Sequence, residues 1–191
     1  MNRTKDAIIE AFWDLLDERP FHKITVKDIV DRCQINRNTF YYHFHDIPEL
    51  LEITVKQEAD DIIRSNSQFG SHLDCVKPFV ELSLRRKRAL LHIYRSLQRE
   101  VFLKEAERIA TYAVTEYIRT AAADLTISER DNALLIRFYK CLLIGVMLDW
   151  LDDGMQYDLL AAASRLAELF GDPGRQAYLN AAESFRETDF E

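Results

Sequence analysis

Apolar residues recur at intervals of three and four positions along almost the whole chain, with charged residues between them. This spacing places the apolar side chains on one side of an α-helix, whereas a half-buried strand alternates at every second residue. Glycine and proline, which an all-β protein needs at its many turns, number only five and four among the 191 residues. The sequence therefore predicts an all-α protein of about nine or ten helices.

Breaks in the pattern divide these helices into two parts. Pro20 ends the first helix, because the residue before a proline leaves the α conformation, and Pro48 marks the first turn of the fourth. The polar stretch Ser65–Ser71 is the best candidate joint. Beyond it we expect Pro78 near the start of the next helix. The later helices are predicted at Leu73–Leu84, Ala89–Leu97, Phe102–Ala122, Leu134–Trp150, Leu159–Phe170 and Arg175–Arg186.

The charge is unevenly distributed. The chain carries a net charge of −7, which argues against broad non-specific binding of nucleic acid. Residues 1–45 carry seven basic and seven acidic side chains, and residues 46–191 carry 18 and 25. The segment from Phe21 to His45 contains four basic residues and two acidic ones. A basic segment on an acidic body is typical of a site-specific anion binder, although chance explains the charges of so short a segment equally well.

The cysteines and the lengths of the apolar runs indicate where in the cell the protein is expected to lie. Cys33, Cys75 and Cys141 are far apart and odd in number, so we expect small buried side chains in a reduced environment, not disulfides or metal ligands. No apolar run is long enough to cross a bilayer, and the first residues show no secretory pattern. We therefore expect a soluble, cytoplasmic protein.

Two short predicted helices contain the candidate functional residues. Thr25 and Asp28 form a capping box at the start of the first, and Asn36 caps the second, which runs from Arg37 to Phe44. Such a pair is a candidate helix-turn-helix, whose second helix must be exposed for its side chains to reach base edges. We expect Phe40 and Phe44, four residues apart, to anchor it inward.

The exposed side chains of that second helix are of the right kind for DNA. A guanidinium at Arg37 suits the O6 and N7 atoms of guanine, and a carboxamide at Asn38 suits the N6 and N7 atoms of adenine. Hydroxyl and imidazole groups suit phosphate oxygens. An aromatic cluster facing inward is the alternative, but three large residues in a row cannot all face inward on a helix. The phosphate-binding candidates are Thr39, Tyr41, Tyr42 and His43.

At these residues the sequence resembles the TetR family of transcriptional regulators. The resemblance lies in Thr25, in Ile29-Val30, in the block Thr39–Phe44 and in Glu49-Leu50, and it covers residues 5–55. It implies that Thr25 also touches the DNA backbone. The DNA-binding set that we expect is Thr25, Asn36, Arg37, Asn38, Thr39, Tyr41, Tyr42 and His43.

Two positions depart from the family pattern. Cys33-Gln34 replaces the small residue and glycine of the turn, so Gln34 must adopt a conformation that glycine usually adopts. Ile47 replaces the lysine that begins the fourth helix in the family and contacts a phosphate there. We expect either a modest affinity for DNA or compensation by Lys23 and Lys27.

The resemblance implies a domain division and a mode of action. It places a three-helix DNA-binding domain at residues 1–48, with the helix-turn-helix at about 25–44, and a helical ligand-binding and dimerisation domain at 49–191. It implies a homodimeric regulator, a repressor that a small-molecule effector releases from double-stranded DNA at a palindromic operator. The alternatives are an architectural DNA-binding protein and a sensor or interaction protein, both without a small-molecule effector.

The helix 134–150 is apolar on two sides, with Leu135, Tyr139 and Leu142 on one and Leu134 and Phe138 on the other. One side can pack within the chain and the other against a second copy, unless both are buried in one monomer. The interface residues that we expect are Val146, Trp150, Ala162, Leu166 and Phe170.

Other candidate sites are weaker. The basic run Arg85–Arg88 is consistent with a second anion site or with a solvated junction between helices. A group of aromatic residues reads as the lining of an effector pocket or as ordinary core. No phosphate-binding loop, nucleophile elbow or Glu-x-x-His metal motif occurs in the sequence, so we expect no catalysis, no metal and no cofactor. The pocket candidates are Tyr94, Phe102, Tyr112, Phe138 and Tyr139.

Overall fold

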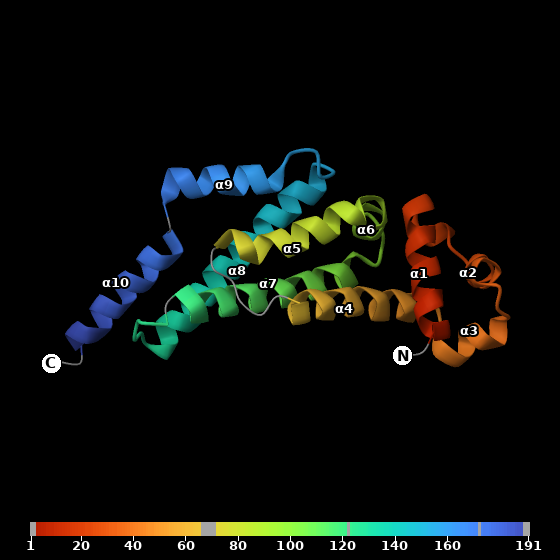
Figure 1. Cartoon of the computed structure of the whole chain (residues 1–191), viewed down its shortest axis with the longest axis horizontal. Coiled ribbons are helices and arrows are strands. Elements are labelled where there is room, and N and C mark those ends of the chain that lie inside the picture. The colour runs from red at the N-terminus through yellow and green to blue at the C-terminus, as the bar shows by residue number, and fades with distance from the viewer. Residues whose placement is uncertain (1–2, 66–71, 122, 172, 189–191) are drawn as a thin grey trace. The chain divides into compact units, whose positions relative to one another are not determined.

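A computed structural model describes residues 3–65, 72–121, 123–171 and 173–188 of the chain (Figure 1). The predicted all-α fold is confirmed, because these residues form α-helices and one 3₁₀ turn, Phe21–Lys23, without strands. The α-helices are α1 (Arg3–Glu18), α2 (Val26–Cys33), α3 (Arg37–His43), α4 (Ile47–Ser65), α5 (His72–Arg85), α6 (Lys87–Tyr94), α7 (Arg99–Ala121), α8 (Glu129–Asp152), α9 (Leu159–Phe170) and α10 (Pro173–Thr188).

The described chain packs as two compact units. The first unit comprises residues 1–61 with 82–106, and the second comprises residues 62–81 with 107–191. The packing therefore places α6 in the same unit as α1–α3, although more than forty residues separate them in the sequence. The predicted division by function at residue 48 stays a prediction.

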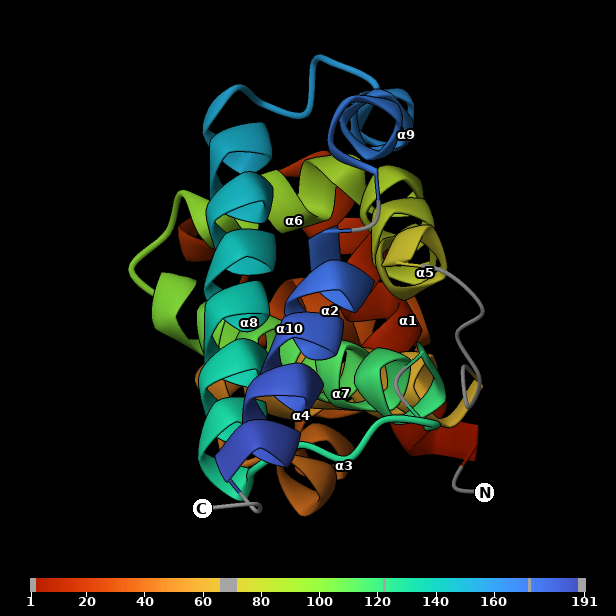
Figure 2. The ribbon, with the colours of Figure 1, turned by 90° about the vertical axis from the view of Figure 1, so that its left-hand side faces the viewer.

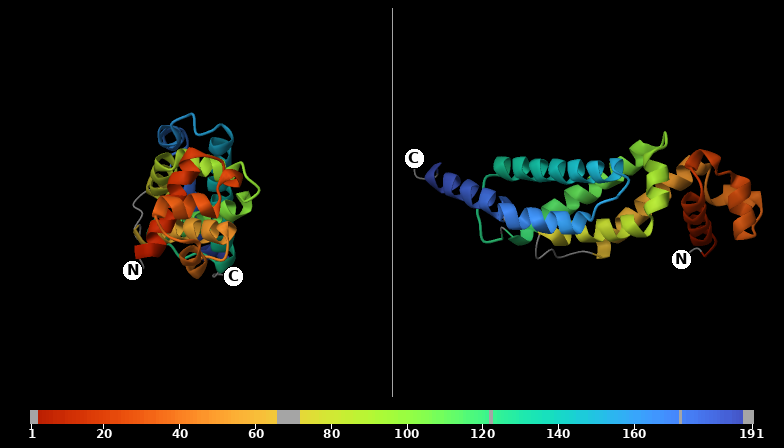
Figure 3. Two further views of the ribbon diagram at one scale, coloured as in Figure 1. Left: turned by 90° about the vertical axis from the view of Figure 1, so that its right-hand side faces the viewer. Right: turned by 90° about the horizontal axis from the view of Figure 1, so that it is seen from above.

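The first unit is built around α1. This helix packs most extensively against α6 and then against α2, which in turn contacts α3, and Figure 3 shows α1 and α3 near each other from above. Burial of these apolar side chains stabilises the unit, at about 1.5–3 kcal/mol for each large one. The most deeply buried are Ile8, Phe12, Leu15 and Leu16 of α1, Ile29 of α2, Phe40 of α3, Phe44 after it, Leu50 and Leu51 of α4, and Ile93 of α6.

In the second unit, α7, α8 and α10 share a hydrophobic cluster. Val114 and Ile118 of α7 are buried against Tyr178 of α10, and partly buried side chains of α8 pack against all three. Figure 2 shows α10 lying by α7 and α8. Ser128 caps the start of α8, because its Oγ accepts a hydrogen bond from the backbone N–H of Asp131 at 3.0 Å.

Several predicted boundaries are wrong. Pro78 lies in the interior of α5, because this helix begins at His72, six residues earlier. The predicted helix Ala89–Leu97 is the shorter α6, which ends at Tyr94 because Ser96 bonds back to the carbonyl of Ile93. The 3₁₀ turn after Pro20 was not predicted. Most of the predicted joint, residues 66–71, lies outside the described residues.

Candidate nucleic-acid interface

The start of α2 is closed by its own side chains. The hydroxyl of Thr25 accepts from the backbone N–H of Asp28 at 3.2 Å and donates to Oδ2 of Asp28 at 2.6 Å, while the backbone N–H of Thr25 donates to that oxygen at 2.9 Å. The predicted capping box is therefore confirmed. These hydrogen bonds, with Arg19 at 3.4 Å, hold the pKa of Asp28 below its usual range. The hydroxyl of Thr25 is thus engaged within the protein.

The turn between α2 and α3 has the conformation that the sequence predicts. Gln34 caps α2 with φ 54° and ψ 41°, in the left-handed region that favours glycine. The backbone N–H of Ile35 donates to the carbonyl of Val30 at 3.0 Å, which satisfies one of the open carbonyls at the end of α2. The turn therefore forms without glycine, at a cost in backbone strain.

Asn36 and two phenylalanines orient α3. Oδ1 of Asn36 accepts from the backbone N–H of Thr39 at 2.9 Å and from its hydroxyl at 3.1 Å, so the predicted N-cap is confirmed. Phe40 and Phe44 are fully buried, as predicted, with their ring centroids 5.8 Å apart. Since these rings fix the inward side of this short helix, the other side must face solvent.

The outward side of α3 presents four exposed side chains. Arg37 and Asn38 are exposed in its first turn, Tyr41 is 55% exposed and Tyr42 is 83% exposed. The ring of Tyr42 lies edge-on to that of His43, with 4.9 Å between centroids. This surface carries a guanidinium, a carboxamide and two phenols, which are donors suited to base edges and phosphates.

The other four predicted DNA-binding residues are either half-buried or engaged in helix caps. Thr39 and His43 are half-buried, and the side-chain oxygens of Thr25 and Asn36 are occupied by caps. The structure thus brings the block from Asn36 to His43 onto one short helix and its cap, while Thr25 lies at the start of the preceding helix.

The start of α4 is closed by carboxylates. Oδ1 of Asp46 accepts from the backbone N–H of Glu49 at 2.8 Å, and the carboxylate of Glu49 accepts from the backbone N–H of His45. The hydrogen bond from Glu49, followed by the contact with the ring of His45, lowers the pKa of Asp46. At Ile47, where the family has a lysine, this helix start therefore combines an apolar side chain with two carboxylates, which disfavours a nearby phosphate.

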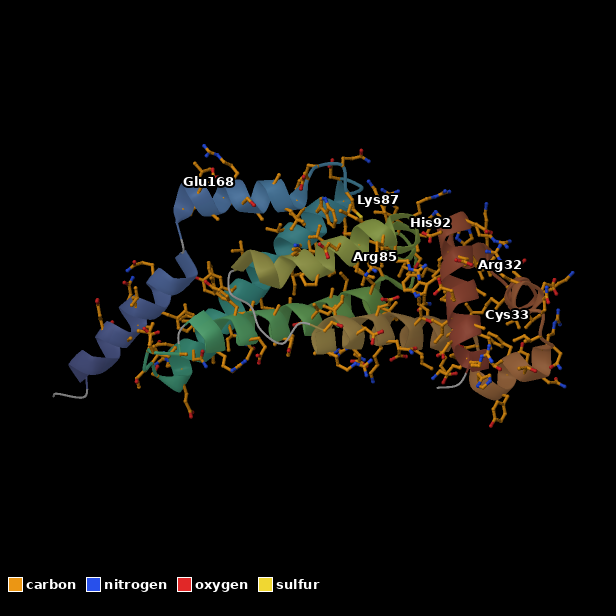
Figure 4. The ribbon with its side chains drawn as sticks, viewed as in Figure 1. Arg32, Cys33, Arg85, Lys87, His92 and Glu168 are labelled. Carbon is orange, nitrogen blue, oxygen red and sulfur yellow. The ribbon has the colours of Figure 1, made fainter. Side chains whose placement is uncertain are left out.

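Contacts from α6 support α1, and sequence reasoning missed them. The ring Nδ1 of His92 donates to the carbonyl of Leu16 at 2.6 Å, where Pro20 offers no N–H to complete the helix (Figure 4). Oδ1 of Asp17 accepts from the backbone N–H of Ala89 at 3.0 Å, and so caps α6 from another helix. Partners 72 and 76 residues apart leave no signal in a local pattern.

The basic run Arg85–Arg88 joins helices. The guanidinium of Arg86 donates to both carboxylate oxygens of Glu10 at 3.2 Å and lies 5.2 Å from the ring centroid of Trp13. Arg85 and Arg88 are exposed. On α2, Arg32 holds the carboxylate of Glu18 at 2.7 and 2.9 Å. These pairs fix α2 and α6 to α1 within the first unit.

The five pocket candidates do not form one group. Tyr94 and Phe102 are buried together in the first unit, with ring centroids 6.3 Å apart. Tyr112 and Tyr139 pack in clusters of the second unit, and Phe138 is 59% exposed. A common pocket for the five therefore stays a prediction, and the exposure of Phe138 is typical of a surface position.

The interface candidates are divided between surface and core. Leu166 and Phe170 of α9 are exposed, and Val146 and Ala162 are half-buried. Trp150, in contrast, is 1% exposed in the single chain, and its Nε1–H donates to the carbonyl of Tyr157 at 2.9 Å. Its burial within its own chain leaves the side chain of Trp150 almost no surface for a second copy to contact.

The two sides of α8 also differ from the prediction. Leu135 and Tyr139 pack in the cluster with α7 and α10, whereas Leu142 is exposed in line with Leu134 and Phe138, eight and four residues earlier. Cys141, expected to be buried, is exposed next to Leu142 because it lies on this uncovered side. Cys33 is half-buried, and the side chain of Cys75 lies outside the described part of the structure.

The described residues contain neither a metal-binding cluster nor a membrane-spanning helix. No three or more histidine, cysteine, aspartate or glutamate side chains in the described ranges are arranged to hold a metal ion. None of the helices in the described part of the chain is long and apolar enough to cross a membrane.

Two family models match the sequence. One, described as "Bacterial regulatory proteins, tetR family", matches residues 8–53 and so includes α2 and α3. The other, described as "Transcriptional regulator C-terminal region", matches residues 75–172. Together they cover the exposed surface of α3 and most of the helical region that follows.

Two named relatives are similar in sequence. The HTH-type dhaKLM operon transcriptional activator DhaS of Lactococcus lactis is 35% identical over 66 residues, which are 35% of each protein. The HTH-type transcriptional regulator YxbF of Bacillus subtilis is 26% identical over 163 residues, which are 80% of this chain and 40% of that protein. The chain thus spans well under half the length of the curated relatives that it matches.

Solved structures share the fold. The Dihydroxyacetone kinase operon activator DhaS superposes with a TM-score of 0.73 at 19% identity, over 87% of this chain and 93% of that chain. A tetR-family transcriptional regulator from Streptomyces coelicolor superposes with a TM-score of 0.64 at 15% identity, over 93% of this chain and 90% of that chain. At these identities the likeness concerns the fold alone.

Proposed function

Since this chain belongs to the TetR family of transcriptional regulators, we propose that it binds a specific palindromic DNA operator as a homodimer. The observation that carries this proposal is the outward side of α3. Arg37, Asn38, Tyr41 and Tyr42 are exposed there, while Phe40 of the same helix is fully buried. A packing role does not account for four polar-tipped side chains exposed on one side of a short helix, whereas a major groove has a use for each of them.

We assign the side chains of this surface different roles. Arg37 and Asn38 read base edges, and Tyr41, Tyr42 and His43 contact phosphates. Asn36 and Thr25 hold the helix starts through their side-chain oxygens, so their contribution to DNA binding is mainly to position α2 and α3.

The phosphate contacts at α2 are assigned to lysines. The hydroxyl of Thr25 already donates to Asp28, and the start of α4 carries carboxylates instead of a lysine. Lys23 and Lys27 are exposed on either side of the start of α2. Each of these lysines that contacts a phosphate contributes about 0.9 to the slope of log affinity against log salt.

The second copy covers two exposed apolar rows. On α8 the row is Leu134, Phe138 and Leu142, and on α9 it includes Leu166 and Phe170. Rows of this kind on two helices are typical of surfaces that another chain covers. Gly145 continues the α8 row, and nothing in the structure lies within 4 Å of the position of a β-carbon there, so another helix can approach closely.

The dimer is tested by placing a charge in these rows. Leu166→Glu should give a monomer in analytical ultracentrifugation and abolish operator binding, because each half-site alone offers too few base contacts. Leu97→Glu is the matched control, since Leu97 is an exposed leucine of the first unit and outside the rows. A Leu166→Glu variant that stays dimeric contradicts the proposed interface.

Transcriptional repression with release by a small molecule is the mode that we propose first. A dimer bound across an operator excludes other proteins from the same DNA, and an effector that prefers the unbound conformation releases it. Activation is the second candidate, because the relative that is 35% identical over 66 residues is named a transcriptional activator. A reporter gene behind the operator distinguishes the two by the sign of the change when the regulator is deleted.

Selection from random duplex DNA tests the function itself. At physiological salt, the purified protein should enrich a palindrome whose half-sites lie about one turn of DNA, ~34 Å, apart. An architectural protein would retain DNA without a common motif, and a sensor or interaction protein would not retain DNA at all. Either of these results overturns the proposed function.

A further inference from the structure

One aromatic side chain of α10 fills the cluster between α7 and α8. Tyr178 is 2% exposed and packs against Val114 and Ile118 of α7. Leu135 and Leu143 of α8 line the same cluster. Tyr178 is thus a phenol ring in a mostly aliphatic cluster, to which Tyr117 and Tyr139 also belong.

A polar group closes one end of this cluster. The hydroxyl of Tyr178 donates to Oδ1 of Asn132, in the first turn of α8, at 3.4 Å, which is long for a hydrogen bond between oxygens. Burial raises the pKa of Tyr178, and the neighbouring phenol of Tyr139 raises it further. The hydroxyl of Tyr178 therefore stays protonated and available as a donor. The site therefore pairs apolar walls with a carboxamide acceptor and a neighbouring phenol, which is the composition of a small-molecule pocket.

In its described part, the helix that supplies this ring has one other buried side chain. Among the described side chains of α10, residues 176–184, Tyr178 and Ala182 are buried. All of α10 also lies beyond residue 172, where the match to the C-terminal family model ends. Because two of the nine described side chains are buried, this part of α10 is suited to local opening that leaves α7 and α8 in place.

We propose that Tyr178 occupies the effector site of this regulator, and that the effector is a phenol-sized aromatic ring with one hydroxyl. The ligand takes the place of the Tyr178 ring, donates its hydroxyl to Asn132 and displaces α10. This proposal rests on the proposed function only where it calls the ligand an effector. The hydroxyl of Tyr178 lies 3.4 Å from Oδ1 of Asn132, and the hydroxyl of a free phenol can make a shorter hydrogen bond there.

Phenol itself is the probe, used on the full chain without DNA. Tyr178→Ala removes the internal competitor, so calorimetry should give a phenol dissociation constant at least about tenfold lower than that of the wild type. Tyr157→Ala is the matched control, because Tyr157 is a half-buried tyrosine of the same unit whose hydroxyl donates to Asp149. Adding Asn132→Leu to Tyr178→Ala should remove the preference for phenol over benzene.

Hydrogen exchange on the wild type tests the displacement directly. Saturating phenol should raise the exchange of the backbone amides of α10 while those of α8 stay protected. If Tyr178→Ala does not fold, Tyr178→Leu and this wild-type measurement decide. Equal phenol affinity in the wild type and in the folded Tyr178 variant, or phenol binding with unchanged exchange of α10, overturns the proposed site.

The effector role has its own readout. Phenol should lower the affinity of the wild type for the selected operator, and the Tyr178→Ala variant should respond at a lower phenol concentration. If phenol displaces α10 while operator affinity stays constant, the effector role is wrong and the binding site stands. If no operator is selected, the proposed function is wrong, and the exchange measurement still tests the site.

Discussion

Replacing Gln34 by glycine should stabilise the protein. Gln34 has φ 54° and ψ 41°, a left-handed conformation that costs a residue with a β-carbon about 1–2 kcal/mol. Glycine adopts this conformation without that cost, but its freer unfolded chain removes about 0.4–1 kcal/mol of the gain. The side chain of Gln34 is exposed, so little packing is lost. The expected gain is about 0.5–1 kcal/mol in the free energy of unfolding.

Urea denaturation followed by circular dichroism at 222 nm measures this gain. For a chain of this size, it corresponds to a rise of about 1–4 °C in Tm. Gln34→Ala is the matched control, because alanine keeps the β-carbon and therefore the strain, and its free energy of unfolding should stay within about 0.5 kcal/mol of the wild type. If the glycine variant is no more stable than the alanine variant, the strain assigned to this turn is absent.

Three further changes test the packing around the helix-turn-helix. Asp17→Ala removes the cap that α1 provides for the backbone N–H of Ala89, and it should cost about 1 kcal/mol in urea denaturation; no loss of stability would contradict this cap. Phe40→Ala empties a fully buried site, and it should cost about 3–5 kcal/mol and abolish operator binding in a gel-shift assay, whereas operator binding at wild-type affinity would show that the ring does not hold α3. The pKa of Asp28 is lowered in the folded state, so its carboxylate contributes stability above its ordinary value of 3.8 and loses it as the pH falls through the lower folded value. Asp28→Asn should therefore flatten the fall in stability on acidification, and an unchanged pH profile would rule out this contribution.

The local features of the DNA-binding segment were predictable because their causes are local. The caps at Thr25 and Asn36 need partners only three residues ahead, and the burial of Phe40 and Phe44 follows from their spacing. The strained turn at Gln34 was also expected, since the family pattern has glycine there. For these elements, the residue types and their spacing contain the physical reason.

The features that were not predicted depend on distant partners. His92 donates to the carbonyl of Leu16 only because α6 packs on α1, and no local pattern brings residues 76 apart together. The same holds for Leu142, whose exposure depends on which side of α8 the other helices cover. Pro78 was misplaced because proline favours the first turn of a helix, whereas α5 contains it in its interior, where it removes one backbone hydrogen bond.

The central claim is that the exposed side of α3 reads DNA sequence. The most direct measurement compares the affinities of wild type and Arg37→Ala for the selected operator and for random duplex at the same salt concentration. We predict a loss of about 1–3 kcal/mol on the operator, little change on random duplex and a relaxed preference at one base pair of each half-site. Tyr42→Phe, the phosphate-contact control, should weaken both duplexes equally. If Arg37→Ala selects the same motif with the same ratio of affinities as the wild type, α3 does not read bases through Arg37 and the account is contradicted.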